Sequence, residues 1–231
     1  MATRTRTKTP PRRATPLTPG RIVVAALELA DDRGEFSMRA LGKVLGVDPM
    51  AIYRHFRDKE ALLDSMVDAL LVDFEPPPPD SGSAVERLRR MALDLRRAIS
   101  THPGIGLRAS ATLLTLGPHS LELTEAALDL LHEIVLDRDQ AALAYLTLIR
   151  FISGTGCAED HVRRTGQTDD EWHEEVRSAY QSVPQERLPL VLGMAGILAT
   201  RSFDEQFEFG IDALLTGFVA RARHSTQQGA S

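Results

Sequence analysis

Between residues 50 and 59, the chain carries side chains of the kinds that contact nucleic acid. Tyr53 can hydrogen-bond to a phosphate and pack its ring against a sugar or a thymine methyl group, and Arg54 can bond to a guanine or a phosphate. Lys59 begins a predicted helix over about residues 59–73, which Asp58 caps and whose N-terminal dipole attracts a phosphate as well. These residues predict a DNA-contacting surface, to which Met50, Ala51 and His55 also belong.

Two short predicted helices position this surface. The first covers residues 38–45, with Met38, Leu41, Val44 and Leu45 as its apolar stripe, and the second covers residues 49–56. Gly46 can adopt the left-handed conformation that ends the first helix, and Ile52 and Phe56 face inward from the second. Such a pair is a helix-turn-helix, in which the first helix braces the second against the major groove.

Charge is distributed unevenly along the chain. Residues 1–71 carry twelve Lys and Arg against nine Asp and Glu, a net charge of +3, whereas the remainder carries fifteen against twenty-three, a net charge of −8. This asymmetry suits a DNA-facing N-terminal domain joined to an acidic domain. A basic tail without a partner explains the charge equally well.

The whole chain is predicted to be all-α, because no alternating strand pattern occurs. A basic arm without apolar periodicity covers residues 1–16, the DNA-binding domain 17–72, and a proline-rich connector 73–83. Helical patterns then fill a larger domain over 84–224, followed by a tail at 225–231.

The longest helical patterns of the larger domain are apolar segments at 141–163, with Asp137 and Gln140 as its predicted cap, and at 203–223. Ser83 and Glu86 form a capping-box pattern at the start of this domain, and a short helix is predicted around Trp172 to Tyr180 in an otherwise polar, poorly periodic stretch.

Enzyme chemistry finds little support in the sequence. The seven histidines are scattered without the spacing of a zinc site. Gly154-Thr-Gly156 lies in an apolar helical pattern and does not follow a strand, so it is not a dinucleotide-binding loop. We therefore expect no catalytic site, cofactor or metal.

The single cysteine, Cys157, indicates the cellular compartment. No intramolecular disulfide can form, and a reducing cytoplasm is expected. No apolar run is long enough for a membrane span, and no secretory signal is present.

Residues 18–71 resemble the DNA-binding domain of the tetracycline-repressor (TetR) family. The motifs that carry the resemblance are AALELADDRG, SMRALGKVLGV and IYRHFRDKEALL. A weaker resemblance covers residues 84–222, where FEFGIDALLTGF is similar to the C-terminal domain of the tetracycline-repressor branch. The resemblance implies a homodimeric regulator that binds operator DNA and responds to a small molecule.

The resemblance also implies roles for individual residues. Arg39 matches a position that reads a base or a phosphate, and Lys59 matches the phosphate-binding lysine. The other matched positions approach the backbone or the base edges: Ser37, Met38, Pro49, Met50, Ala51, Tyr53 and His55. Because Pro49 and Met50 are not polar base readers, base recognition would depend on Arg39, Arg54 and apolar contacts with thymine methyl groups. Arg12 and Arg13 of the arm can add phosphate or minor-groove contacts.

For the C-terminal domain, the resemblance implies a four-helix bundle between subunits, built from 141–163 and 203–223, although an ordinary domain core would show the same apolar stripes. The resemblance also implies an effector cavity, which we expect to be mostly apolar. Magnesium-tetracycline is not the expected effector, because Gly106–Ser110 lacks the histidine that its binding would need. The predicted lining residues are Met91, Leu95, Leu107, Leu113, Leu128, Leu131, Tyr145, Phe151 and Cys157.

The resemblance thus favours a repressor that binds a palindromic operator as a homodimer and is released by a small, mostly hydrophobic effector. Two alternatives stay open at this point. A protein of the same fold can activate transcription or respond to a protein partner, because the sign of regulation depends on where the operator lies. A small helical enzyme or binding protein with an incidental helix-turn-helix is the alternative from another class.

Overall fold

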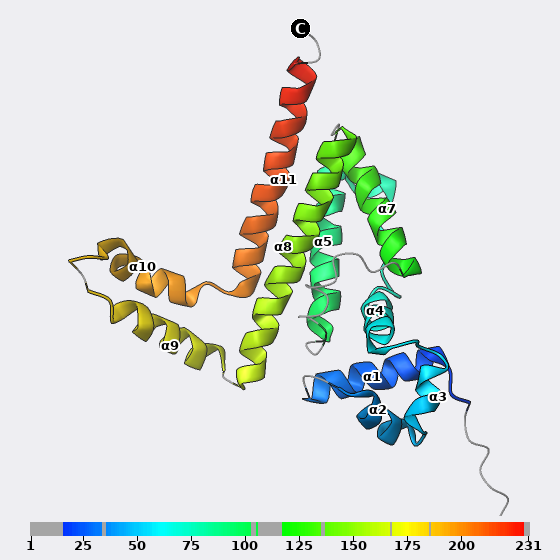
Figure 1. Ribbon diagram of the computed structural model, residues 1–231. Helices are drawn as coiled ribbons and strands as arrows, with labels where there is room; N and C mark the ends of the chain where they lie inside the picture. The colour runs from blue at the N-terminus through cyan, green and yellow to red at the C-terminus, as the bar shows by residue number, and fades with distance from the viewer. Residues whose placement is uncertain are drawn as a thin grey trace, which may run out of the picture.

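The computed structural model describes residues 16–33, 36–102, 105, 117–134, 137–166, 168–184 and 186–228. Every regular element among these residues is a helix, which confirms the predicted all-α class. The chain forms a small N-terminal group of helices at one end of a larger helical body (Figure 1). Within the described part of the chain, no helix is both long and apolar enough to cross a membrane.

The N-terminal group consists of α1 (Pro19–Arg33), α2 (Met38–Leu45), α3 (Pro49–Tyr53) and α4 (Lys59–Ala69). Its apolar core includes Ile22, Leu41, Ile52, Leu62 and Met66, none of which is exposed to solvent. The predicted apolar stripe of α2 is wrong at Val44, which is 56% exposed, because the buried face of this helix is centred on Met38 and Leu41 and Val44 lies beyond its edge.

Two predicted helix ends in this group are also wrong. Helix α3 ends at Tyr53 instead of Phe56, because the N–H groups of His55 and Phe56 both donate to the carbonyl oxygen of Ile52 in a turn. Phe56 nevertheless lies in the N-terminal core, because the turn directs its side chain inward. Helix α4 ends at Ala69 instead of near residue 73, and a turn continues from there.

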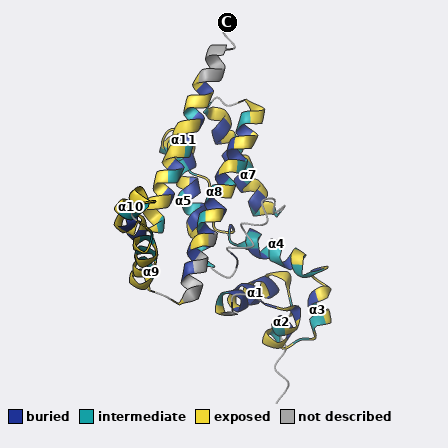
Figure 2. Cartoon of the chain, turned by 60° about the vertical axis from the view of Figure 1, so that its left-hand side comes forward, coloured by how far each residue is buried: buried dark blue, intermediate teal, exposed yellow. Residues whose placement is uncertain are grey.

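The larger body is built around α5 (Ala84–Thr101), α7 (Pro118–Glu133), α8 (Arg138–Thr165) and α11 (Phe203–Gln228), after a short 3-10 helix, η1 (Pro79–Ser81). Ser83 and Glu86 form the predicted capping box at the start of α5. The predicted cap of α8 also forms, since Asp137 accepts a hydrogen bond from the Gln140 N–H at 2.8 Å, although the helix begins three residues earlier than predicted. Buried side chains line the inner faces of these helices (Figure 2).

Helices α9 (Asp169–Gln181) and α10 (Pro189–Thr200) form a hairpin that projects from the body (Figure 1). Helix α9 begins earlier than the predicted Trp172, because Thr168 and Glu171 form a capping box. Helix α10 is apolar, yet only Ala195 and Ala199 are buried along it.

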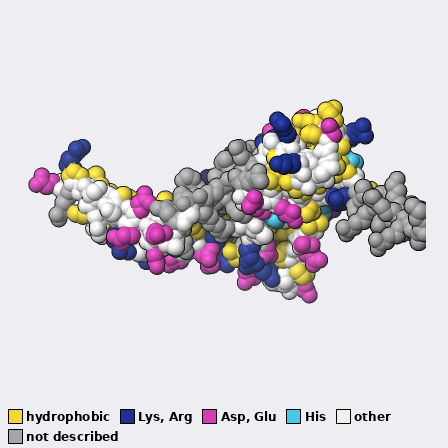
Figure 3. Space-filling model, turned by 90° about the horizontal axis from the view of Figure 1, so that it is seen from below, with side chains coloured by type: hydrophobic (Ala, Val, Ile, Leu, Met, Phe, Trp, Pro, Cys, Tyr) yellow, Lys and Arg dark blue, Asp and Glu magenta, His cyan; other side chains and the backbone are white. Residues whose placement is uncertain are grey.

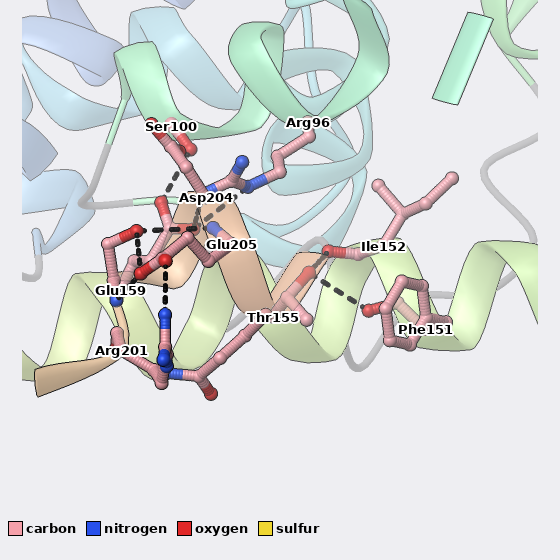
Figure 4. A network of polar contacts seen from close by, with 11 residues as sticks. Arg96, Ser100, Phe151, Ile152, Thr155, Glu159, Arg201, Asp204 and Glu205 are labelled. Carbon is pink, nitrogen blue, oxygen red and sulfur yellow. Dashed lines mark hydrogen bonds and ion pairs between the residues drawn. The ribbon is translucent and has the colours of Figure 1, made fainter. Parts of the chain in front are cut away.

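An ionic network around the buried Arg96 and Glu159 joins α5, α8 and α11 (Figure 4). The Arg96 Nε donates to Glu159 Oε1 at 2.9 Å, and the Arg96 guanidinium also pairs with Asp204 at 2.7 Å. Ser100 donates to the second carboxylate oxygen of Glu159 at 3.1 Å. The guanidinium carbon also lies 4.7 Å from the centre of the Phe207 ring. These contacts fix the first turns of α11 against α5 and α8.

Candidate DNA-binding surface and effector cleft

The turn between α2 and α3 is set by local capping. Ser37 caps α2 by accepting a hydrogen bond from the Ala40 N–H at 3.1 Å, and Asp48 caps α3 by accepting one from the Met50 N–H at 2.8 Å. Gly46 ends α2 with a φ of 68°, the left-handed conformation that its type favours. The Val47 N–H then donates to the Gly42 carbonyl at 2.9 Å, which closes the turn.

Gly42 allows the two helices to approach each other closely. A Cβ at this position would lie 3.0 Å from the carbonyl oxygen of Val47 and 3.2 Å from Cγ of Pro49. Any larger side chain would push the start of α3 away from α2. The sequence therefore fixes α3 against its bracing helix, as a helix-turn-helix requires.

The predicted reading surface lies on the outer side of α2 and α3. Arg39, Tyr53, Arg54 and His55 are exposed, and Met50 is 64% exposed. Ser37 is exposed at the start of α2, and Pro49 and Ala51 are half-buried in α3. Seen from this end of the molecule, Lys and Arg side chains surround an apolar patch on the N-terminal group, whereas Asp and Glu are frequent elsewhere (Figure 3).

Met38 does not share this exposure. Its side chain is buried in the N-terminal core, so the part of it that faces solvent is too small for a side-chain contact with DNA. Lys43, which was not among the residues predicted to contact DNA, is exposed on α2 one turn after Arg39. The spacing of four residues between Arg39 and Lys43 could have indicated that Lys43 belongs to the DNA-binding surface, because it places both side chains on the same face of a helix.

Lys59 lies at the first turn of α4. Asp58 caps this helix by accepting a hydrogen bond from the Ala61 N–H at 2.7 Å. The Lys59 Nζ lies 5.0 Å from the centre of the Phe36 ring, and this cation–π contact restrains the ammonium group beside the helix N-terminus. Both the ammonium group and the helix dipole attract a phosphate.

A cleft of about 620 Å³ lies between the end of α4 and the C-terminal half of α5. This volume is within the range of about 300–1,000 Å³ that small-molecule sites occupy. Its lining combines apolar and acidic side chains: Ala69, Leu70, Val72, Asp73, Phe74, Glu75, Asp94, Ala98, Thr101 and His102.

The predicted effector-lining residues lie elsewhere. Met91, Leu95 and Tyr145 line an apolar cavity of about 20 Å³ between α5, α7 and α8, which is too small for a drug-sized molecule. Leu131 is fully buried in the same core, and Leu128 and Phe151 pack against it. Leu107 and Leu113 lie outside the described residues, as does the side chain of Cys157. No cluster of metal-ligating side chains occurs among the residues that the structure describes.

A helix-turn-helix with an exposed basic surface, joined to a separate helical body, defines a DNA-binding transcription regulator. Two family models match the chain. The model described as "Bacterial regulatory proteins, tetR family" covers residues 22–66, and "Tetracyclin repressor-like, C-terminal domain" covers residues 76–222. The chain belongs to the TetR family of bacterial regulators, as the motifs in the sequence predicted, and this family consists of transcription regulators and not of enzymes.

Individual relatives agree with this assignment. The HTH-type transcriptional repressor DrrR1 of Streptomyces coeruleorubidus is 30% identical over 212 residues, which span 87% of this chain and 77% of the relative. The class C tetracycline repressor protein of Escherichia coli is 26% identical, over 89% of this chain and 91% of the relative. The crystal structure of ActR from Streptomyces coelicolor in complex with actinorhodin superposes with a TM-score of 0.79 at 28% identity, covering 90% of this chain and 99% of ActR.

Proposed function

We propose that this protein is a cytoplasmic transcriptional repressor that binds a palindromic operator as a homodimer and leaves it when a small organic effector binds. The observation that carries the proposal is the exposed surface of α2 and α3, which is held in place by Gly42 and Gly46. The repressors among its relatives support the sign of regulation.

Base recognition would combine charged and apolar contacts. Arg39, Lys43 and Arg54 are exposed cations that can bond to guanine or phosphate. Met50, beside the half-buried Ala51, offers an apolar surface that suits a thymine methyl group. Ser37, Tyr53, His55 and Lys59 would contact the DNA backbone.

Exposed faces of α8 and α11 support the homodimer. Leu143 is 65% exposed on α8 and Phe209 is 79% exposed on α11, which is unusual for side chains of this size. Small residues continue both faces at helical spacing: Gly154 and Ala158 on α8, and Ala213 and Gly217 on α11. A second copy of these two helices would cover the apolar side chains, and the small residues would let the helices approach closely.

The cleft between α4 and α5 is the proposed effector site. It has the volume of a drug-sized ligand, and Ala69 and Leu70 of α4 form part of its wall. Actinorhodin bound to ActR supports an organic effector. A ligand that extends toward Met91, Leu95 and Tyr145 would have to displace α7, because the cavity there is small.

An effector screen tests this function. Drug-sized organic compounds, beginning with actinorhodin, would be screened for a raised melting temperature, and each hit would then be added to the protein–operator complex. A hit should release the DNA, because a ligand that favours the non-binding arrangement shifts the equilibrium toward it. Hits that stabilise the protein but leave the complex intact would contradict release by an effector.

A further inference from the structure

A carboxylate near the end of α4 is tied to the first turn of α7. Asp68 is only 7% exposed, and its Oδ1 accepts hydrogen bonds from the Ser120 N–H at 2.8 Å and the Ser120 hydroxyl at 2.9 Å. The other carboxylate oxygen lies 2.9 Å from Nδ1 of His119. Asp68 therefore caps α7 from another helix, across 52 residues of sequence.

Gly117, which precedes α7, packs directly against the Asp68 side chain. A Cβ at Gly117 would lie 2.2 Å from Cγ of Asp68. Only glycine permits the end of α4 and the start of α7 to pack at this distance. The two helices consequently cannot slide past each other without breaking the Asp68 hydrogen bonds.

A second pair of the same chemical kind joins α1 to the end of α5. Oδ2 of Asp31 lies 2.6 Å from Nδ1 of His102. In both pairs, the carboxylate comes from the DNA-binding group and the imidazole from the larger body. Two connections from different helices restrain the rotation of the group as well as its distance from the body.

Helix α4 transmits this restraint to the reading surface. Leu62 and Met66 are fully buried in the N-terminal core, so α4 moves together with α2 and α3. Ala69 and Leu70, immediately after Asp68, line the proposed effector cleft. The helix segment that holds the α7 cap therefore lies directly before the wall of the cleft.

We propose that Asp68 is a positioning residue, whose contact with the first turn of α7 fixes the DNA-binding group relative to the larger body. This inference rests on the proposed function. It predicts that the contact controls how strictly the protein discriminates between operator half-site spacings, because only fixed reading surfaces require a fixed spacing.

The test compares two DNA duplexes, one with the natural operator and one with two additional base pairs between its half-sites. The wild-type protein should bind the second duplex about tenfold more weakly, within the range of about 5–150-fold that is common for coupled sites. Asp68→Ala and Gly117→Ala break the contact in two independent ways, so both should reduce this ratio to about threefold or less. Their affinity for a single half-site should match that of the wild type, because neither residue lies on the reading surface.

Controls separate this role from a general effect on folding. Asp129→Ala removes an exposed carboxylate of α7 that lies nine residues after Ser120, away from the contact with Asp68, and should keep the wild-type ratio. Ser120→Ala removes only the hydroxyl hydrogen bond and provides a milder variant if Asp68→Ala fails to fold. An unchanged ratio in the folded variants, or the loss of half-site affinity in Asp68→Ala, would overturn the inference alone. A wild-type protein that binds no palindromic DNA would overturn the proposed function as well.

Discussion

Gly210 of α11 lies directly against the ring of Phe151 of α8. A Cβ at residue 210 would come within 2.2 Å of Cζ of Phe151. The ring cannot easily move away, because it stacks on Phe207 with a centroid distance of 5.3 Å. This contact sets how closely α8 and α11 approach each other within one subunit.

Gly210→Ala should therefore destabilise the protein by about 1–3 kcal/mol, the usual cost of inserting a methyl group into a packed core. Urea denaturation at one fixed protein concentration measures this change. Gly20→Ala is the matched control, since a Cβ there meets nothing within 4 Å, and its free energy of unfolding should not fall. Equal stability of the two variants would show that α8 and α11 are not packed as described.

Much of the fold could be predicted from the sequence because helix caps and apolar periodicity are local signals. Ser83 with Glu86, and Asp58 before α4, mark helix starts that the structure reproduces. The beginning of α9 was missed although Thr168 and Glu171 form the same capping pattern, because the surrounding segment is polar and poorly periodic. The end of α3 was missed because the turn that follows it has no distinctive residue type.

The candidate site could be predicted only in part. The motif positions of Arg39 and Tyr53 indicate surface residues, and both are exposed. Met38 occupies a similar motif position but is buried, since its apolar side chain packs into the core instead. Contacts such as that of Asp68 with Ser120 have no local sequence signal, because they depend on how distant helices pack.

Arg39 and Lys59 should differ in their effects on DNA binding. Arg39→Ala should cost about 1–3 kcal/mol and relax specificity at one base pair of each half-site if the guanidinium reads a base. Lys59→Ala should weaken binding to all DNA sequences. The slope of the logarithm of the binding constant against the logarithm of salt concentration should become shallower by about one unit per site, because one fewer phosphate is neutralised. Titrations of operator and unrelated DNA at several salt concentrations distinguish the two patterns. Unchanged operator affinity in both variants would remove these residues from the reading surface.

The proposed dimer can be tested at its exposed apolar side chains. Light scattering at micromolar concentration should show a dimer for the wild type, and Phe209→Arg should shift it toward the monomer, because a charge would be buried in the interface without a partner. Leu214, which the apolar stripe of the last helix also indicates, is a poorer test, since it packs against the core of its own subunit. A monomeric wild type would contradict the dimer and leave a palindromic operator without explanation.

The stability of the protein should depend on the ionisation of Asp68. Burial of this carboxyl raises its pKa, but hydrogen bonds from His119 and Ser120 outweigh that effect and hold the pKa below its ordinary value. A lowered pKa in the folded state means that the carboxylate stabilises the fold above the unfolded-state pKa and that this contribution is lost as the pH falls through the folded-state pKa.

Asp68→Asn removes this titration. The difference in free energy of unfolding between wild type and variant should be constant at neutral pH and should shrink from about pH 5 downward. Urea denaturation between pH 7 and the acid limit of folding measures it. A difference that grows on acidification would contradict the assigned direction of the pKa shift.

A binding assay on the DNA upstream of its own gene tests most directly whether this chain reads a specific DNA sequence. Fluorescently labelled upstream DNA would be titrated with the purified protein at low salt, in the presence of excess unrelated competitor DNA. We predict a complex that resists the competitor, and its affinity should drop when either half of a palindrome in the protected region is scrambled. Binding that the competitor abolishes at every upstream fragment would contradict the account.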